Sequence, residues 1–116
     1  MGLVSLLQKQ VEHRALFVCQ HRNQGLPPEM GKANFEPVEN GVIFIKQHYL
    51  LDSNHCDYMR SVAKIVWDHD EETWLLLITD DEANESWKPY PYLTKSGDLT
   101  AIMREVEKDP KEIFWS

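Results

Sequence analysis

Residues 61–90 read SVAKIVWDHDEETWLLLITDDEANESWKPY, and this stretch decides the fold. Two acidic stretches, 68–72 and 80–85, divide it into three apolar segments. One tryptophan falls in each segment: Trp67, Trp74 and Trp87. β-Branched and aromatic segments separated by short polar turns are typical of antiparallel strands. The pattern predicts three consecutive strands, over residues 59–67, 73–79 and 86–90, with the acidic stretches as solvated turns.

The pair Asn40-Gly41 marks a further hairpin upstream. The segments 35–38 and 42–45 flank it, and a two-residue turn of this kind needs positive φ at both central residues. A polar loop is predicted over residues 50–57, before the next strand. In total we expect an antiparallel sheet of four to five strands in meander order, in which each strand pairs with the one before it.

Two helices are expected, one before the sheet and one after it. Residues 3–22 carry apolar side chains at a spacing of three to four residues, which is the period of a helix with one buried face. Asp98 is placed to cap a second helix over residues 99–108, which Asp109-Pro110 would end, before the apolar tail 113–115. The fold class predicted is α+β, with an N-terminal helix, the sheet and a C-terminal helix in a single domain over residues 1–116.

Both faces of the predicted sheet are apolar. Residues 74–78 read WLLLI and residues 42–45 read VIFI, whereas a strand with one wet face would alternate apolar and polar side chains. Either the two helices cover opposite faces, or both share one face and a second subunit covers the other. We favour the shared face with a homodimer.

The charge of the chain excludes several classes of partner. Its 116 residues carry a formal net charge of −7, with only 12 Lys and Arg. Nucleic acids and anionic membranes are bound mainly through clustered cations, so neither is expected as a partner. A basic or neutral protein partner is the simpler expectation.

Nothing in the sequence indicates export or membrane insertion. No apolar run approaches the ~20 residues of a membrane-spanning helix, and the first residues, MGLVSLLQKQ, lack the basic region of a signal peptide. The two cysteines then remain free thiols, as is usual in a reducing compartment. We expect a cytoplasmic protein.

Short motifs along the chain follow the order of a known family. They are Pro27-Pro28, Val38-Glu39-Asn40-Gly41-Val42, Val62-Ala63-Lys64, Trp74, Trp87 with Tyr90, and Asp109 followed by Phe114-Trp115-Ser116. In this order the chain resembles the bacterial family called domain of unknown function 3024. The chain departs from that pattern at Lys88, where the family has His, and at Leu77 and Ile78, where it has Trp and Arg nearby. The resemblance implies a fold and no activity.

Four residues have the chemistry of a zinc site: Cys19, His21, His55 and Cys56. Two thiolates and two imidazoles are a sufficient set of ligands, but the adjacent His55 and Cys56 point apart. Cys19 as a small core residue, with His55 and Cys56 on a loop, explains the same residues more simply. No motif fixes a cysteine–histidine nucleophile pair either, so we predict neither a metal nor a cofactor.

The aromatic residues Trp87, Tyr90 and Tyr92 lie beside Pro89 and Pro91, near the predicted edge of the sheet. Exposed aromatic side chains are common anchors of protein interfaces, so these three are the candidates for partner contact. The function predicted is therefore a cytoplasmic, non-enzymatic protein-interaction module that associates with itself. The alternative is a small-ligand-binding protein or enzyme, with a site near His48, His55 and Cys56.

Overall fold

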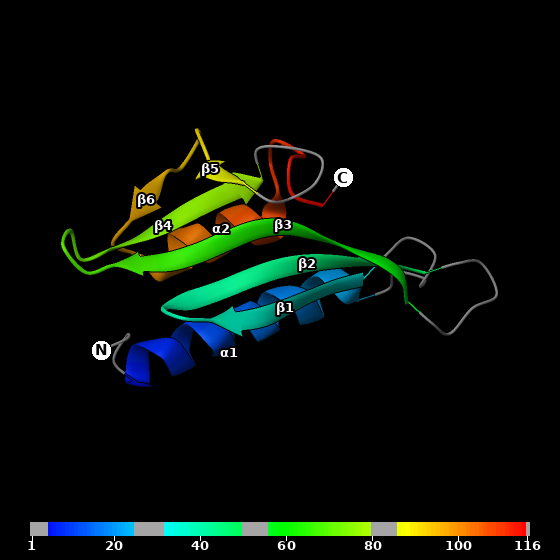
Figure 1. The fold of residues 1–116 in the computed structure, drawn as a ribbon, viewed down its shortest axis with the longest axis horizontal. Helices are drawn as coiled ribbons and strands as arrows, with labels where there is room; N and C mark the ends of the chain where they lie inside the picture. Colours follow the sequence, from blue (N-terminus) through cyan, green and yellow to red (C-terminus); the bar gives the residue numbers. More distant parts are fainter. Residues whose placement is uncertain (1–4, 25–31, 50–55, 80–85, 116) are drawn as a thin grey trace.

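A computed structural model describes residues 5–24, 32–49, 56–79 and 86–115. The chain forms an antiparallel sheet with two helices against it (Figure 1). In chain order the elements are α1 (Ser5–Asn23), β1 (Lys32–Val38), β2 (Gly41–Tyr49), β3 (Cys56–Asp68), β4 (Thr73–Thr79), β5 (Trp87–Pro89), β6 (Lys95–Ser96) and α2 (Leu99–Lys108). The predicted α+β class, with its N-terminal and C-terminal helices, is confirmed.

The strands follow one another in meander order, β1-β2-β3-β4-β5, as predicted. The short strand β6 also pairs with β4, next to β5 along the same edge. It was not predicted, because two residues are too few to show a periodic pattern. Trp67 and Trp74 are register partners in β3 and β4, and their ring centroids lie 5.0 Å apart. The two strands are thus held together next to the acidic turn by contact between these two aromatic rings.

The first hairpin turns one residue earlier than predicted. Val38 pairs with Gly41, so the two loop residues are Glu39 and Asn40, and Asn40 has φ 65°. Gly41 lies within β2, where a Cβ atom would overlap the carbonyl oxygen of Ile65 on the neighbouring strand. Glycine is therefore needed at this position for close approach of two backbones, and the turn is displaced by one residue.

The start of β3 also differs from the prediction. Cys56 and Asp57 are strand residues, and Cys56 pairs with Tyr49 at the end of β2, whereas a loop was predicted over 50–57. Residues 50–55 lie outside the described part of the chain. The pairing of β3 with β2 shifts register at Val62 and again at Asp57, as it does at a β-bulge.

Both helices lie on the same face of the sheet (Figure 1). α1 packs against β1 and β2, α2 packs beside it against β4 and β6, and the two helices contact each other. Of the two arrangements left open by the sequence, the chain adopts the shared face. The core between the layers contains, among others, Val11, Val18, Phe44, Ile65, Leu76, Ile102 and Val106.

The ends of α2 are fixed by two aspartates. Asp98 accepts a hydrogen bond of 3.0 Å from the backbone N–H of Thr100, which confirms the predicted cap. After the helix, the buried carboxylate of Asp109 accepts hydrogen bonds from the backbone N–H groups of Ile113, Phe114 and Trp115, at 2.8, 3.1 and 3.0 Å. The predicted apolar tail is thereby folded back, and its last two rings become part of the core.

Candidate interaction surfaces

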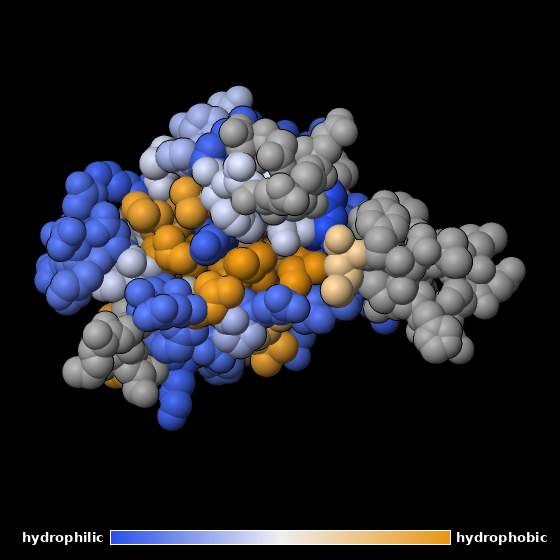
Figure 2. Space-filling model, in the orientation of Figure 1, coloured by the Kyte–Doolittle hydropathy of each residue, from blue (hydrophilic) through white to orange (hydrophobic). Residues whose placement is uncertain are grey.

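The sheet face opposite the helices carries an apolar strip that we call the open face. It consists of alternate strand residues: Ile43 and Ile45 in β2, Val66 in β3, and Leu75 and Leu77 in β4. Their neighbours in sequence point to the helices, and none of these five described side chains belongs to the core there. Ile45 is buried and the other four are partly exposed. Figure 2 looks onto this face and shows apolar surface along its middle.

Two charged residues accompany the strip. Lys64 is the register partner of both Ile43 and Leu77, and register partners project to the same face of a sheet. Its Nζ lies 5.7 Å from the ring centroid of Trp87, a cation–π contact. Glu36 in β1 is the register partner of Ile43 on the other side and is exposed. The open face therefore carries a cation within its apolar strip, between Ile43 and Leu77, and an anion at the β1 side of the strip.

The three aromatic candidates do not form one surface. Trp87 is half-buried at the rim of the open face, paired with Thr79. Tyr90 is fully buried on the helix side, with its ring centroid 4.8 Å from that of Phe114, so it presents no surface to a partner, contrary to the prediction. Tyr92 is 59% exposed and packs against Tyr90, at 5.5 Å between ring centroids. Only Trp87 lies beside the open face.

The zinc candidates within the described residues do not converge. Cys19 is buried, and burial raises the pKa of its thiol to about 12. His21 lies two residues further along α1 and is exposed, with Nδ1 2.8 Å from Glu107 Oε1. Side chains two residues apart on a helix point in different directions, so Cys19 and His21 are not placed to bind the same metal ion. Over the described ranges, no group of three or more His, Cys, Asp or Glu is placed to hold a metal.

The alternative site near His48, His55 and Cys56 stays a prediction. His48 lies near the end of β2 and Cys56 begins β3, at the same end of the sheet. The side chains of both, and the whole of His55, lie outside the part of the chain that the structure describes.

The acidic turn between β3 and β4 has a structural role. Asp68 Oδ1 accepts hydrogen bonds from the backbone N–H groups of Asp70 and Glu71, at 3.0 and 3.4 Å. Glu71 also pairs with Lys95 on the neighbouring strand β6. The predicted turn over 68–72 is confirmed, and the second acidic stretch, 80–85, lies outside the described residues.

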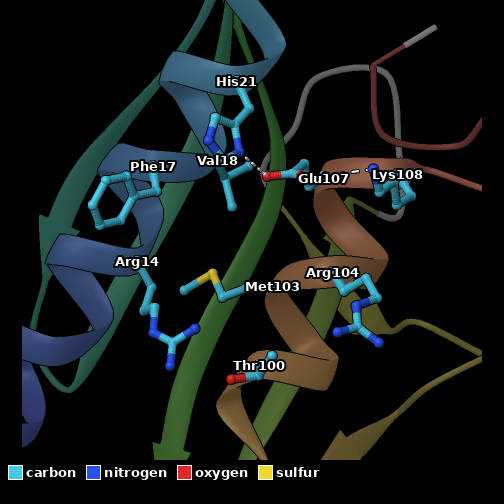
Figure 3. A pocket seen from close by; sticks show the side chains of 9 residues that line it. All are labelled: Arg14, Phe17, Val18, His21, Thr100, Met103, Arg104, Glu107 and Lys108. Atoms are coloured by element: carbon cyan, nitrogen blue, oxygen red, sulfur yellow. Dashed lines mark hydrogen bonds and ion pairs between the residues drawn. The ribbon is translucent and has the colours of Figure 1, made fainter.

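A groove between the two helices was not predicted. It has a volume of about 260 Å³ at its centre and is lined by Arg14, Phe17, Val18, His21, Thr100, Met103, Arg104, Glu107 and Lys108 (Figure 3). One wall comes from α1 and the other from α2. From the sequence one can see only that the helix over residues 3–22 carries polar and aromatic side chains, such as Arg14 and Phe17, outside its apolar stripe. That these face α2 depends on how the two helices pack.

Comparison with known proteins places the chain in a family. Neither described helix is long and apolar enough to cross a membrane. No curated protein and no solved structure matches the chain. Residues 3–116 match the family model described as Domain of unknown function (DUF3024), which covers the sheet and both helices. The chain therefore belongs to the DUF3024 family, as its motifs indicated.

Proposed function

We propose that the protein is a cytoplasmic, non-enzymatic interaction module that forms a homodimer through the open face of its sheet. The observation that carries this proposal is the position of the helices. Both lie on one face, which leaves Ile43, Val66, Leu75 and Leu77 partly exposed on the other. A largely apolar strip on an exposed sheet face is typical of a surface that a partner covers.

Its charges favour a second copy as the partner. In a two-fold symmetric dimer the same patch meets itself, so the patch must be complementary to itself. Lys64 lies in the strip and Glu36 at its β1 side, so a two-fold axis between them brings the lysine of one copy near the glutamate of the other. Opposite charges placed this way set the orientation of the two copies.

The test is the mass of the purified protein by native mass spectrometry and sedimentation, for the wild type and for Leu77→Glu. A carboxylate at position 77 can pair with Lys64, its register partner, so the monomer should stay folded. In the dimer the same carboxylate would lose water at an apolar interface. We expect a wild-type dimer and a Leu77→Glu monomer.

Leu16→Glu is the matched control, because Leu16 is 43% exposed on α1, and α1 lies on the face of the sheet opposite the strip. This variant should remain dimeric. A monomeric wild type at tens of micromolar, or equal dimer masses for all three proteins, would contradict the proposal. Trp87→Ala tests the rim of the interface and should weaken the dimer several-fold, because an aromatic contact is lost. An unchanged dimer would remove Trp87 from the interface.

A further inference from the structure

The groove between α1 and α2 extends beyond its centre. Towards the start of α2 it continues into a hollow of about 290 Å³, which shares Arg14, Phe17 and Thr100 with it. Towards the end of α2 it continues into a hollow of about 450 Å³, which shares His21 and Glu107. The three form one groove along residues 10–24 of α1. At ~1.5 Å per helical residue this is about 20 Å, the length of roughly six extended residues.

The groove is positively charged although the chain is acidic. Its lining contains four Lys and Arg side chains, Arg14, Arg22, Arg104 and Lys108, against two carboxylates, Asp98 and Glu107. Both carboxylates are already engaged. Asp98 caps α2, and Glu107 accepts from His21 at 2.8 Å and lies 3.7 Å from Lys108 Nζ.

The three arginines of the groove differ in the contacts that hold them. Arg22 is held by a hydrogen bond to the Glu107 carbonyl and by the Trp115 ring. Arg14 and Arg104 have no hydrogen-bond or ion-pair partner among the described residues. Figure 3 shows their guanidinium groups projecting from the two helices on either side of Thr100. Guanidinium groups bind carboxylates through two parallel hydrogen bonds, so two carboxylates of a ligand can be held here.

An aromatic side chain lies between the charges. Phe17 is 46% exposed, and its ring centroid is 4.8 Å from that of His13 and 6.3 Å from that of His21. These three rings form a ridge along α1, while the buried Val18 and Met103 form the floor. An exposed aromatic ridge of this kind suits an apolar side chain of a ligand.

We propose that this groove binds an acidic peptide segment of a partner protein in extended form. Its carboxylates would pair with Arg14 and Arg104, and an apolar side chain between them would pack on Phe17. Small-molecule sites enclose most of their ligand, whereas this groove is shallow and long, which fits a chain segment better. The overall charge favours a basic or neutral partner, and the groove is a local exception. It lies on the helix side, so it is independent of the open face.

The probe is a fluorescein-labelled peptide of sequence EELFEE, compared with its counterpart KKLFKK. Fluorescence anisotropy measures binding, and amide chemical shifts of the ¹⁵N-labelled protein locate it. We expect the acidic peptide alone to bind, with shifts confined to residues 10–24 and 97–108. The double variant Arg14→Glu, Arg104→Glu should bind at least about tenfold more weakly, and Phe17→Ala also more weakly.

Lys9→Glu is the control on α1, because it makes the same charge change as Arg14→Glu, half that of the double variant, outside the residues that line the groove. It should bind as the wild type does. No binding at millimolar peptide, equal binding by the double variant, or shifts elsewhere would overturn the proposal. So would equal displacement by free glutamate or inorganic phosphate, since the groove would then hold a small anion and not a peptide.

Discussion

The hydroxyl of Tyr90 donates a hydrogen bond of 2.7 Å to Glu105 Oε2, and so joins the end of the sheet to helix α2. Burial, with the Glu105 carboxylate nearby, raises the pKa of the tyrosine. This contact accounts for the position of Tyr90 in the core, since a buried phenol needs a partner for its hydroxyl.

Tyr90→Phe removes this hydrogen bond and keeps the ring against Phe114. We expect a loss of about 1–2 kcal/mol in the free energy of unfolding, measured by urea denaturation, because the Glu105 carboxylate loses a donor. Tyr92→Phe is the control. Its side chain is 59% exposed, so the change should be within about 0.5 kcal/mol. Equal effects at the two positions would show that the Tyr90 bond is not a stabilising contact.

Cys19 makes the stability depend on alkaline pH. Burial raises the pKa of its thiol from 9.0 to about 12, so as the pH rises above 9 the unfolded state loses this proton first. Its contribution is therefore complete below pH 9 and is lost as the pH rises towards 12, at up to about 1.4 kcal/mol per pH unit. In urea denaturation between pH 8 and 10, Cys19→Ala should lose less stability than the wild type. Parallel losses in the two proteins would contradict this.

Gly41→Ala should be strongly destabilising. The new Cβ would overlap the carbonyl oxygen of Ile65, so β2 and β3 must separate at this point. A loss of about 2–3 kcal/mol is expected in thermal unfolding, as for other overpacked sites. Gly97→Ala is the matched control, since a Cβ there meets nothing within 4 Å, and it should be nearly neutral. Similar melting temperatures for both variants would show that the two strands can separate without cost.

Asp109→Asn tests how the segment after α2 is held. The carboxylate accepts three backbone N–H bonds, and an amide offers only one oxygen while its NH₂ group faces a donor. Asparagine tolerates the left-handed backbone at this position, φ 46°, so backbone strain does not change. We expect the free energy of unfolding to fall by about 2–3 kcal/mol, because hydrogen bonds to the backbone are lost. Asp98→Asn should be nearly neutral in the same urea experiment, because both residues are good helix caps. A larger loss of stability for Asp98→Asn than for Asp109→Asn would show that the Asp109 carboxylate is not what holds the segment after α2.

Local signals in the sequence were sufficient to predict most of the helices and strands. Helix α2 has the predicted bounds because Asp98 and the Asp109-Pro110 pair act on the backbone next to them. The Asn40-Gly41 turn was misplaced because two residues favour a turn without fixing its register. The register is set by β3, where only Gly41 fits against Ile65.

Features that depend on contacts between distant segments of the chain could not be predicted from the sequence. Tyr90 lies next to a proline near an edge strand, but its burial depends on Glu105 and Phe114, which arrive from later in the chain. The groove likewise joins Phe17 of α1 to Arg104 of α2. The two apolar sheet faces were predicted and the shared face was favoured, but only the three-dimensional arrangement decides between the two placements of the helices.

The place of Phe114 and Trp115 in the core has a consequence for synthesis of the chain on the ribosome. The Phe44 and Trp115 ring centroids lie 6.0 Å apart, and the Trp115 indole donates to the Val106 carbonyl at 2.8 Å. Every strand of the sheet is translated before either of these late rings exists. A nascent chain that has not reached Asp109 therefore has all of its strands and both helices, but its core still lacks the two rings that complete it. An incompletely packed chain of this kind is what chaperones bind, and the core is complete only after Trp115 has been synthesised.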